Sequence, residues 1–249
     1  MGPGRVIGRR VIARDEVDST QAELAGLAAE GAEEGTVVTA RHQRRGRGRQ
    51  GRSWWDAPGQ SLLLSVLLRP AIGVAHAPQL SHVAALGVTD ALEAVGIEAG
   101  IRWPNDVLIR GHKVGGILPD AVADAAGRLR HVLLGIGLNV NQEAFPPDVA
   151  RSAISLRLAT GRAHDTGALL DAVLAALDRR YARYIAGGFA SLRPDWRRRA
   201  ISLGTMVTTP AGLSGAAEDI SPEGALLVRL DDGRLLPVWS GEIAVVARD

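Results

Sequence analysis

The chain has 249 residues, 46% hydrophobic and 22% charged, which is enough for one large domain or for a large domain with a small module. It contains no cysteine, which excludes disulfides, thiolate catalysis and cysteine-ligated zinc, and it shows neither a signal-peptide pattern nor an apolar run that would cross a membrane. The formal net charge is only +2 although the sequence pI is about 9.6, so we expect a cytoplasmic globular protein, and charge gives little support to nucleic-acid binding.

The N-terminal half alternates helical and strand patterns around one long loop. Thr20 and Glu23 are spaced as a capping box, which predicts the start of a helix. The segment around GRGRQG lacks an apolar period and is rich in glycine, as is typical of a loop. We predict, in order, a helix over 20–32, a strand over 36–41, a loop over 41–59, a buried strand that ends at Pro70 and a helix over 78–95.

The second half is predicted to contain short strands joined by tight turns, then a long helix and a small β module. Gly111 and Gly127 mark the turns of two hairpins, and Pro194 lies near a domain boundary. Strands mixed with helices favour an α/β or α+β main domain. We predict strands over 101–103, 107–109, 114–122 and 129–140, a helix over 167–185, and a β-barrel or meander from residue 201 onward.

Two residue types are rare and cluster in one part of the sequence. Lys113 is the only lysine among 29 basic residues, and the three asparagines are Asn105, Asn139 and Asn141. Because the composition otherwise uses arginine, and because the two cations bind anions differently, the retained lysine marks a candidate site. Asn105 and Asp106 lie at the end of a strand, so they either face that site or only form a turn.

The loop that contains GRGRQG has the composition of an anion-binding segment. Its glycines permit close backbone approach to a ligand, and Arg47, Arg49 and Arg52 offer paired donors to phosphate or carboxylate groups. The loop matches neither a Walker A sequence nor the strand–GxGxxG–helix context of a dinucleotide fingerprint. Two alternatives stay open from the loop alone, an RNA-binding arm and a solvated loop.

Glycines inside two neighbouring strands indicate close approach of a ligand or of another backbone. Gly115 and Gly116 lie in the strand that Lys113 begins, and Gly135 and Gly137 share one face of the next strand. They favour a flat apolar trough with Lys113 at its rim as a fixed cation. Tight packing of a helix on the sheet would require the same glycines, and a lysine at a strand end is often a surface residue.

Taken together, these segments resemble the biotin–protein ligases, also called biotin–acetyl-CoA-carboxylase ligases. The resemblance rests on DSTQAEL (18–24), GRGRQGRSW (46–54), RWPNDVLIRGHKVGGIL (102–118), GIGLNVN (135–141) and a C-terminal stretch similar to the family's SH3-like domain. It implies an α+β fold, with a mixed or antiparallel catalytic sheet packed with helices over 1–200. A small SH3-like β-barrel is expected over 201–249.

The resemblance implies a two-step ligase reaction on biotin and ATP with Mg²⁺, and no tightly bound redox cofactor. Biotin's carboxylate attacks the α-phosphate to give biotinoyl-5′-AMP, and a lysine of the biotin carboxyl carrier protein of acetyl-CoA carboxylase then takes the biotinoyl group. Because the first step brings an anion onto a polyanion, arginine and lysine charge should stabilise its transition state. A closing loop should keep water from the adenylate.

The resemblance also assigns roles to individual residues, with Lys113 and Arg49 as the catalytic pair. The magnesium ligands stay unassigned. Contacts to ATP fall to Arg49, Arg52, Trp54, Asn105, Asp106, Lys113 and Asn139. Contacts to biotin fall to Ser19, Thr20, Gln21, Gln43, Arg47, Gly48, Arg49, Lys113, Gly115, Gly116, Gly135 and Gly137.

Three positions depart from the family pattern. Gln21 stands where asparagine is usual, Arg102 where lysine is usual, and Pro119-Asp120 near a frequent glutamate. Too few residues precede Asp18 for the DNA-binding domain of bifunctional members, so we expect neither repression nor a DNA partner. A homodimer is compatible with the sequence. The rival functions are a lipoate–protein ligase or octanoyltransferase on the same catalytic fold, and an RNA- or DNA-binding protein.

Overall fold

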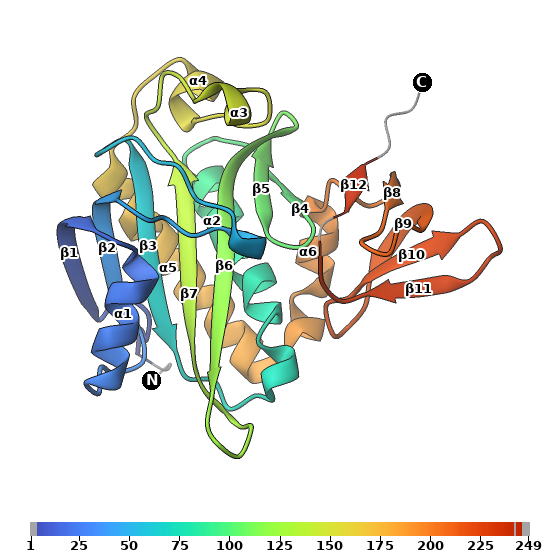
Figure 1. Cartoon of the computed structure of the whole chain (residues 1–249), viewed down its shortest axis with the longest axis horizontal. Helices are drawn as coiled ribbons and strands as arrows, with labels where there is room; N and C mark the ends of the chain where they lie inside the picture. Colours follow the sequence, from blue (N-terminus) through green and yellow to red (C-terminus); the bar gives the residue numbers. More distant parts are fainter. Residues whose placement is uncertain (1–3, 242, 246–249) are drawn as a thin grey trace.

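The computed structural model describes residues 4–241 and 243–245, which form two β-sheets with helices (Figure 1). Within those residues the larger sheet has seven strands in the order β1-β2-β3-β7-β6-β5-β4. β1 and β2 are parallel and the other neighbours are antiparallel, so the sheet is mixed, as predicted. The strands are β1 (Arg10–Val17), β2 (Thr36–Gln43), β3 (Ser61–Leu68), β4 (Gly100–Arg102), β5 (Asp106–Ile109), β6 (His112–Ala123) and β7 (Leu129–Asn139).

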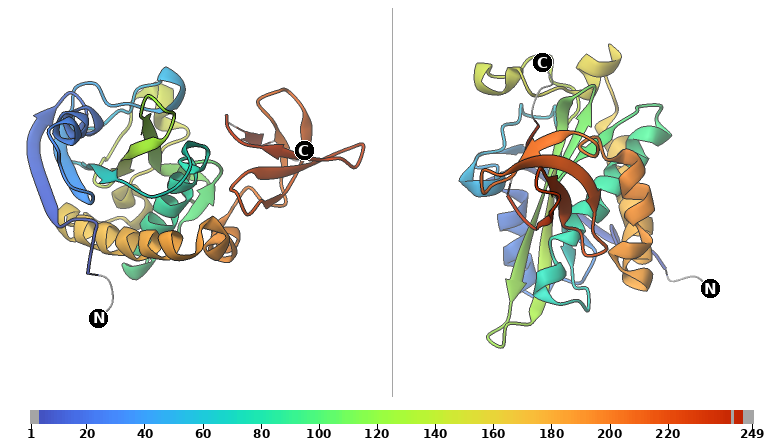
Figure 2. Two further views of the ribbon diagram at one scale, coloured as in Figure 1. Left: turned by 90° about the horizontal axis from the view of Figure 1, so that it is seen from below. Right: turned by 90° about the vertical axis from the view of Figure 1, so that its right-hand side faces the viewer.

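Helices cover both faces of the larger sheet (Figure 2). α1 (Thr20–Ala29) packs on one face against β2, β3 and β7. α2 (Gln79–Ala94) and α5 (Thr166–Gly187) pack against each other on the opposite face. Gly87 permits their close approach, because a Cβ at that position would lie 3.0 Å from Leu177 Cα. The sheet face with α1 therefore carries less helix and leaves room for a site.

The smaller sheet confirms the expected C-terminal β domain. Its strands follow α6 (Arg193–Arg199) and run in the order β11-β10-β9-β8-β12, with antiparallel neighbours. Arg193 connects the two parts, since it donates to the Ile220 carbonyl and pairs with Asp219, both at 2.6 Å. The strands are β8 (Met206–Thr208), β9 (Ser214–Ile220), β10 (Leu226–Leu230), β11 (Leu235–Val238) and β12 (Ala244–Val245).

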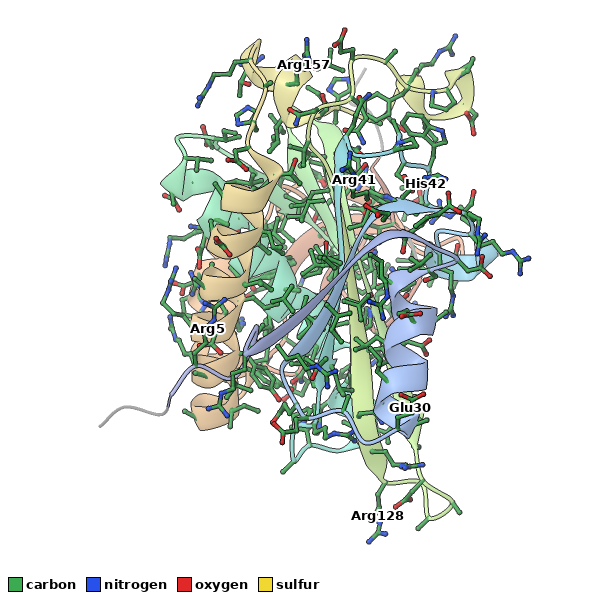
Figure 3. All side chains as sticks on the ribbon, turned by 90° about the vertical axis from the view of Figure 1, so that its left-hand side faces the viewer. Arg5, Glu30, Arg41, His42, Arg128 and Arg157 are labelled. Atoms are coloured by element: carbon green, nitrogen blue, oxygen red, sulfur yellow. The ribbon has the colours of Figure 1, made fainter. Side chains whose placement is uncertain are left out.

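Turns and short helical segments border the larger sheet. The β6–β7 hairpin extends beyond the body of the protein, with Arg128 at its tip (Figure 3). Gly111 and Gly127 have φ angles of 81° and 75°, which confirms both predicted turns. The short helical segments are η1 (Arg49–Gly51), η2 (Val74–His76), α3 (Pro147–Ala150), α4 (Leu156–Thr160) and η3 (Phe189–Ser191).

Three local features differ from the sequence-based prediction. The capping box is wrong: Ser19 occupies the N-cap of α1, and the Glu23 carboxylate instead pairs with Arg14 at 2.9 Å. β1 was not predicted, because it is an edge strand with mostly exposed side chains and no apolar alternation. α6 forms at the predicted boundary, since Pro194 lies in its first turn, where proline is tolerated.

Among the described residues, no helix combines the length and the apolar character needed to span a membrane.

Candidate active site

A cavity of about 430 Å³ lies on the sheet face that carries α1. One wall is the segment of residues 44–55, here called the arginine loop, which lies in front of β6 and β7 (Figure 1). The structure brings all of the predicted site residues except Gly115 to this cavity. They are Ser19, Thr20, Gln21, Gln43, Arg47, Gly48, Arg49, Arg52, Trp54, Asn105, Asp106, Lys113, Gly116, Gly135, Gly137 and Asn139.

The cavity floor is a flat part of β6 and β7 that has no side chains at three glycines. A Cβ at Gly137 would lie 2.7 Å from the Trp54 indole, and one at Gly116 would lie 3.1 Å from it. At Gly135 a Cβ would lie 2.9 Å from the Gln21 side chain. These glycines therefore let Trp54 and Gln21 lie directly on the sheet and narrow the trough.

Gly115 faces the other side of the sheet. A Cβ there would collide with the side chain of Leu138, a residue of the main hydrophobic core. Consecutive residues of a strand point to opposite faces, so Gly115 and Gly116 do not line the same trough. A close contact with the neighbouring strand β7, and not the packing of a helix on the sheet, therefore accounts for Gly115.

One end of the cavity is a network of neutral hydrogen-bonding groups at the start of α1. The Thr20 backbone N–H and hydroxyl lie 2.9 and 3.1 Å from Gln43 Oε1, and that hydroxyl lies 2.8 Å from Ser65 Oγ. Gln21 Nε2 donates to the carbonyls of Leu118 and Leu133 at 2.9 and 3.0 Å. The amide of Gln21 is thus oriented by the sheet, and its Oε1 is the group that remains as an acceptor.

The other end of the cavity is charged. Lys113 Nζ lies 2.6 Å from Asp106 Oδ1, and Arg102 lies 2.7 Å from Asp106 Oδ2. The Lys113 side chain is 32% exposed, and its Nζ lies 5.9 Å from the centroid of the Trp54 ring. The main chain of Lys113 is also held, since its N–H donates to the Ser152 carbonyl and its carbonyl accepts from the Ile154 N–H.

Arg49 extends from the arginine loop toward this charged end. Its guanidinium donates to Asn105 Oδ1 at 3.1 Å and to the Gly241 carbonyl at 3.3 Å, and Asn105 in turn donates to the Ile117 carbonyl. Burial lowers the pKa of Arg49, while the nearby Asp106 carboxylate raises it. Arginine stays protonated at neutral pH even so, and Arg49 is a fixed cation beside the cavity.

The arginine loop closes on itself above the trough. Gly48 N–H donates to the Arg52 carbonyl at 2.7 Å, and Trp54 N–H donates to the Gly46 carbonyl at 2.9 Å. Gln50 has a φ of 56°, a backbone conformation that glycine favours. The Trp54 indole Nε1 is buried and has no hydrogen-bond partner among the described residues.

A buried carboxylate anchors the base of the arginine loop. Asp56 Oδ1 lies 2.8 Å from His42 Nδ1, and its Oδ2 accepts the Gln43 N–H at 3.2 Å. Figure 3 shows His42 at the upper end of β2. The anchor lies directly beside Gln43 of the neutral end, so loop position and ligand contacts are linked.

The site includes residues that no motif predicted. Trp55 and Phe145 contribute an aromatic pair with ring centroids 5.7 Å apart, and Ile243 directly precedes β12 of the small sheet. They lie outside the recognised segments, and only an aromatic residue in a glycine-rich loop signalled Trp55. Asn139 is also more structural than expected, since it donates to the carbonyl of Ile154 at 3.2 Å. Among the described residues no group of three or more metal-ligating side chains occurs.

Comparison with known proteins gives two family matches. The model of the biotin/lipoate A/B protein ligase family matches residues 13–139. The model of the biotin protein ligase C-terminal domain matches residues 205–246. The first range holds all the predicted site residues, and the second holds the smaller sheet.

Individual relatives extend these matches over most of the chain. The bifunctional ligase/repressor BirA of Bacillus spizizenii is 37% identical over 244 residues, covering 96% of this chain and 74% of that protein. The biotin--[acetyl-CoA-carboxylase] ligase of Paracoccus denitrificans is 38% identical and covers 87% and 93%. The biotin protein ligase of Aquifex aeolicus, solved with biotin and ATP, has a TM-score of 0.84 and 29% identity over 96% of this chain and all of that one. The chain therefore belongs to the biotin/lipoate A/B protein ligase family and carries a biotin protein ligase C-terminal domain.

Proposed function

We propose that the protein is a biotin–protein ligase, which activates biotin with ATP and transfers it to a lysine of a biotin carboxyl carrier protein of acetyl-CoA carboxylase. The observation that supports this function best is the two-ended cavity. A glycine floor and neutral acceptors lie at one end, and Lys113 and Arg49 lie at the other. A ligand with an uncharged ring system and a carboxylate tail fits that division.

In the proposed first step, biotin lies in the trough beside Trp54, whose indole already covers Gly116 and Gly137. Gln21 Oε1 accepts a hydrogen bond from an N–H of the ureido ring, and the carboxylate of biotin points toward Lys113. The carboxylate oxygen attacks the α-phosphorus of ATP, with Mg²⁺ bound to ATP as part of the substrate, and pyrophosphate leaves. Lys113 and Arg49 stabilise the negative charge that gathers between the two anions, and Trp54 Nε1 offers a further hydrogen bond.

In the proposed second step, the amine of the acceptor lysine attacks the acyl carbon of biotinoyl-5′-AMP. A C–N bond forms, the C–O bond to phosphate breaks, AMP leaves with the bonding electrons, and the nitrogen loses a proton to solvent. The arginine loop covers the adenylate between the steps, which keeps water from the mixed anhydride. Arg47, Gly48 and Arg52 act in this covering role and in phosphate contact.

Several narrower expectations stay as proposals. Residues 1–200 and 201–249 are proposed as two domains, and the protein as a cytoplasmic enzyme. We also propose that it lacks repressor activity and does not bind DNA, in contrast to the name of the Bacillus relative. An electrophoretic shift assay on the DNA upstream of biotin synthesis genes tests this, and a sequence-specific shift would contradict it. Sedimentation with and without biotin and ATP tests the homodimer.

The direct test is biotin transfer detected by mass. The protein is incubated with MgATP, an acceptor domain and either biotin or lipoate, with an acceptor whose target lysine is changed to arginine as control. We expect biotin on the normal acceptor only, with AMP and pyrophosphate released. Transfer of lipoate but not biotin would make the protein a lipoate ligase. Lys113→Ala is expected to slow adenylate formation about 10²–10³-fold, a typical effect of removing one transition-state donor.

A further inference from the structure

The sequence holds a single side-chain amine. Lys113 is the only lysine among the 29 lysine and arginine residues. Arginine is not an amine nucleophile at neutral pH, because its guanidinium is not deprotonated in proteins. If the proposed function is right, this one amine lies next to a reactive acyl group in every catalytic cycle, since its role is to bind the carboxylate that becomes the anhydride.

Lys113 is paired with the carboxylate of Asp106, which is paired in turn with Arg102. Its Nζ lies 2.6 Å from Asp106 Oδ1, and the other oxygen of Asp106 lies 2.7 Å from Arg102. The Asp106 side chain is only 14% exposed, against 32% for Lys113. Rotation of the carboxylate away from Lys113 would also break the contact with Arg102. The position of Nζ is thus fixed by a carboxylate that lines the same cavity.

We propose that Asp106 prevents Lys113 from capturing the biotinoyl group and so reserves the adenylate for an amine from outside. The inference rests on the proposed ligase function. The reaction that Asp106 suppresses is attack of a neutral Lys113 amine on the acyl carbon of biotinoyl-5′-AMP. A C–N bond forms, the C–O bond to phosphate breaks, AMP leaves with the bonding electrons, and the nitrogen loses a proton to solvent.

The ion pair suppresses this side reaction in two ways. An ammonium held 2.6 Å from a carboxylate must leave that partner before its nitrogen can attack. The pair also directs Nζ toward Asp106, so approach to the acyl carbon along the line of attack requires the pair to break. The product of the side reaction would be a stable, neutral amide. The enzyme would permanently lose the positive charge of its only lysine. Asp106 therefore protects the charge on which the proposed first step depends.

The test uses preformed biotinoyl-5′-AMP without any acceptor, so it does not depend on the first step. Wild type, Asp106→Asn and the double variant Asp106→Asn/Lys113→Arg are incubated with it, and peptides are mapped by mass. We expect Lys113 in Asp106→Asn to be biotinylated about tenfold faster than in wild type, as expected for the loss of one charge-assisted hydrogen bond. The double variant should carry no label at position 113.

A control variant supplies the reactivity of an ordinary lysine. Arg128 lies at the tip of the β6–β7 hairpin with 81% of its side chain exposed, so Arg128→Lys adds an amine far from the site. In the folded Arg128→Lys variant we expect Lys113 to react with a small acyl phosphate about tenfold more slowly than the introduced lysine. This comparison keeps Asp106 in place and stands even if Asp106→Asn does not fold.

Two results would overturn the proposal. One is equal labelling of Lys113 in wild type and Asp106→Asn, and the other is equal reactivity of Lys113 and the introduced lysine in the folded Arg128→Lys variant. A failed ligase function has a different signature, because wild type would then form no biotinoyl-5′-AMP from biotin and MgATP. The two failures are therefore told apart by that single assay.

Discussion

Arginines are concentrated in two regions of the molecule, and their partners differ. In the arginine loop, Arg49 bonds to the side-chain amide of Asn105 and to the carbonyl of Gly241, which carry no net charge. In the joint between α2, α5 and α6, Arg180 instead donates to both oxygens of Asp90, at 2.6 and 2.9 Å, and to Asp195. The contrast is between Arg180, which is paired with carboxylates, and Arg49, which is hydrogen-bonded to neutral groups. Arg44, Arg45 and Arg47 of the loop pair with Asp18 and Asp120 at its surface.

The pKa shifts of these arginines have opposite directions. Hydrogen bonds to Asp90 raise the pKa of Arg180 and outweigh its burial, whereas burial lowers the pKa of Arg49. Asp106 opposes this effect of burial on Arg49 only in part, and a partly buried cation without a directly bonded carboxylate is favoured by the arrival of an anion. The difference is consistent with a joint that serves stability and with the proposed role of Arg49 toward an anionic ligand.

The largest effect is expected from Arg49→Ala. It should slow biotinoyl-5′-AMP formation roughly 10²–10³-fold, because the variant loses a fixed cation at the place where charge develops. The melting temperature should change little, since the partners of Arg49 are neutral. Pyrophosphate release measures the rate. The matched control is Arg183→Ala in the joint, with a side chain 48% exposed, which should keep the rate within about twofold. A similar loss of rate in both variants would remove the distinction between the regions.

The arginine loop and the central strands could be predicted from sequence because their chemistry is local. Glycines, the rare lysine and asparagines and the arginine cluster marked the loop and the central strands, whereas Ser19, Gln21 and Gln43 were assigned from the family resemblance. Gly115 was misplaced because two adjacent glycines in a strand carry no sign of which one faces the ligand. Gly241 and Ile243 could not be found, since their place depends on how the small sheet docks.

The ion pairs of the joint could not be predicted from the sequence, because they too depend on how distant elements pack. Arg180 is separated from Asp90 by 90 positions in the sequence and from Asp195 by 15. The ion pairs therefore form only when α2, α5 and α6 pack together. β1 was missed because an exposed edge strand lacks apolar alternation. The core strands and the two long helices were predicted, since their apolar periods record burial directly.

The second largest effect is expected from His82, at the joint. Its ring packs near Phe189 and Trp196 and lies 3.2 Å from the Gly224 carbonyl, and burial lowers its pKa to about 4. Unfolded histidine titrates near 6.5, so between about pH 6.5 and 4 only the unfolded chain gains this proton. The free energy of unfolding should therefore fall by about 3 kcal/mol as the pH is lowered from about 6.5 to 4. Above about pH 6.5 the contribution of neutral His82 to stability is complete.

Urea unfolding at pH 7, 5.5 and 4 measures the His82 effect. The control is His82→Gln, whose amide keeps a donor for the Gly224 carbonyl but does not titrate. Wild type should lose about 3 kcal/mol more than this variant between pH 7 and 4. Parallel pH profiles would show that His82 takes up its proton in the folded state, and the joint would then tolerate a buried charge as the arginine loop does.

A third, smaller effect is expected from Arg180→Met. The variant removes the hydrogen bonds to Asp90 and Asp195, while Arg199 and Arg198 still neutralise those carboxylates. We therefore expect a loss of about 2 kcal/mol in the free energy of unfolding, the scale of a hydrogen bond to a charged group. The KM for biotin should not change. Chemical denaturation and initial rates measure the two quantities, and a raised KM with unchanged stability would contradict the assignment.

The smallest effect is expected from Asp120→Ala, at the edge of the arginine loop. Asp120 lies 3.3 Å from Arg47, but the two side chains are 40% and 53% exposed, so the pair should contribute less than about 0.5 kcal/mol. Urea unfolding should barely change, and 0.5 M salt should erase any difference, because exposed ion pairs are screened at roughly this concentration. Arg47→Ala should be as stable as Asp120→Ala. It should bind biotin more weakly in a calorimetric titration, because the proposed contact between the Arg47 side chain and the ligand is lost. A loss of more than about 1 kcal/mol in Asp120→Ala would mean that an ion pair fixes the loop as firmly as those of the joint fix the helices.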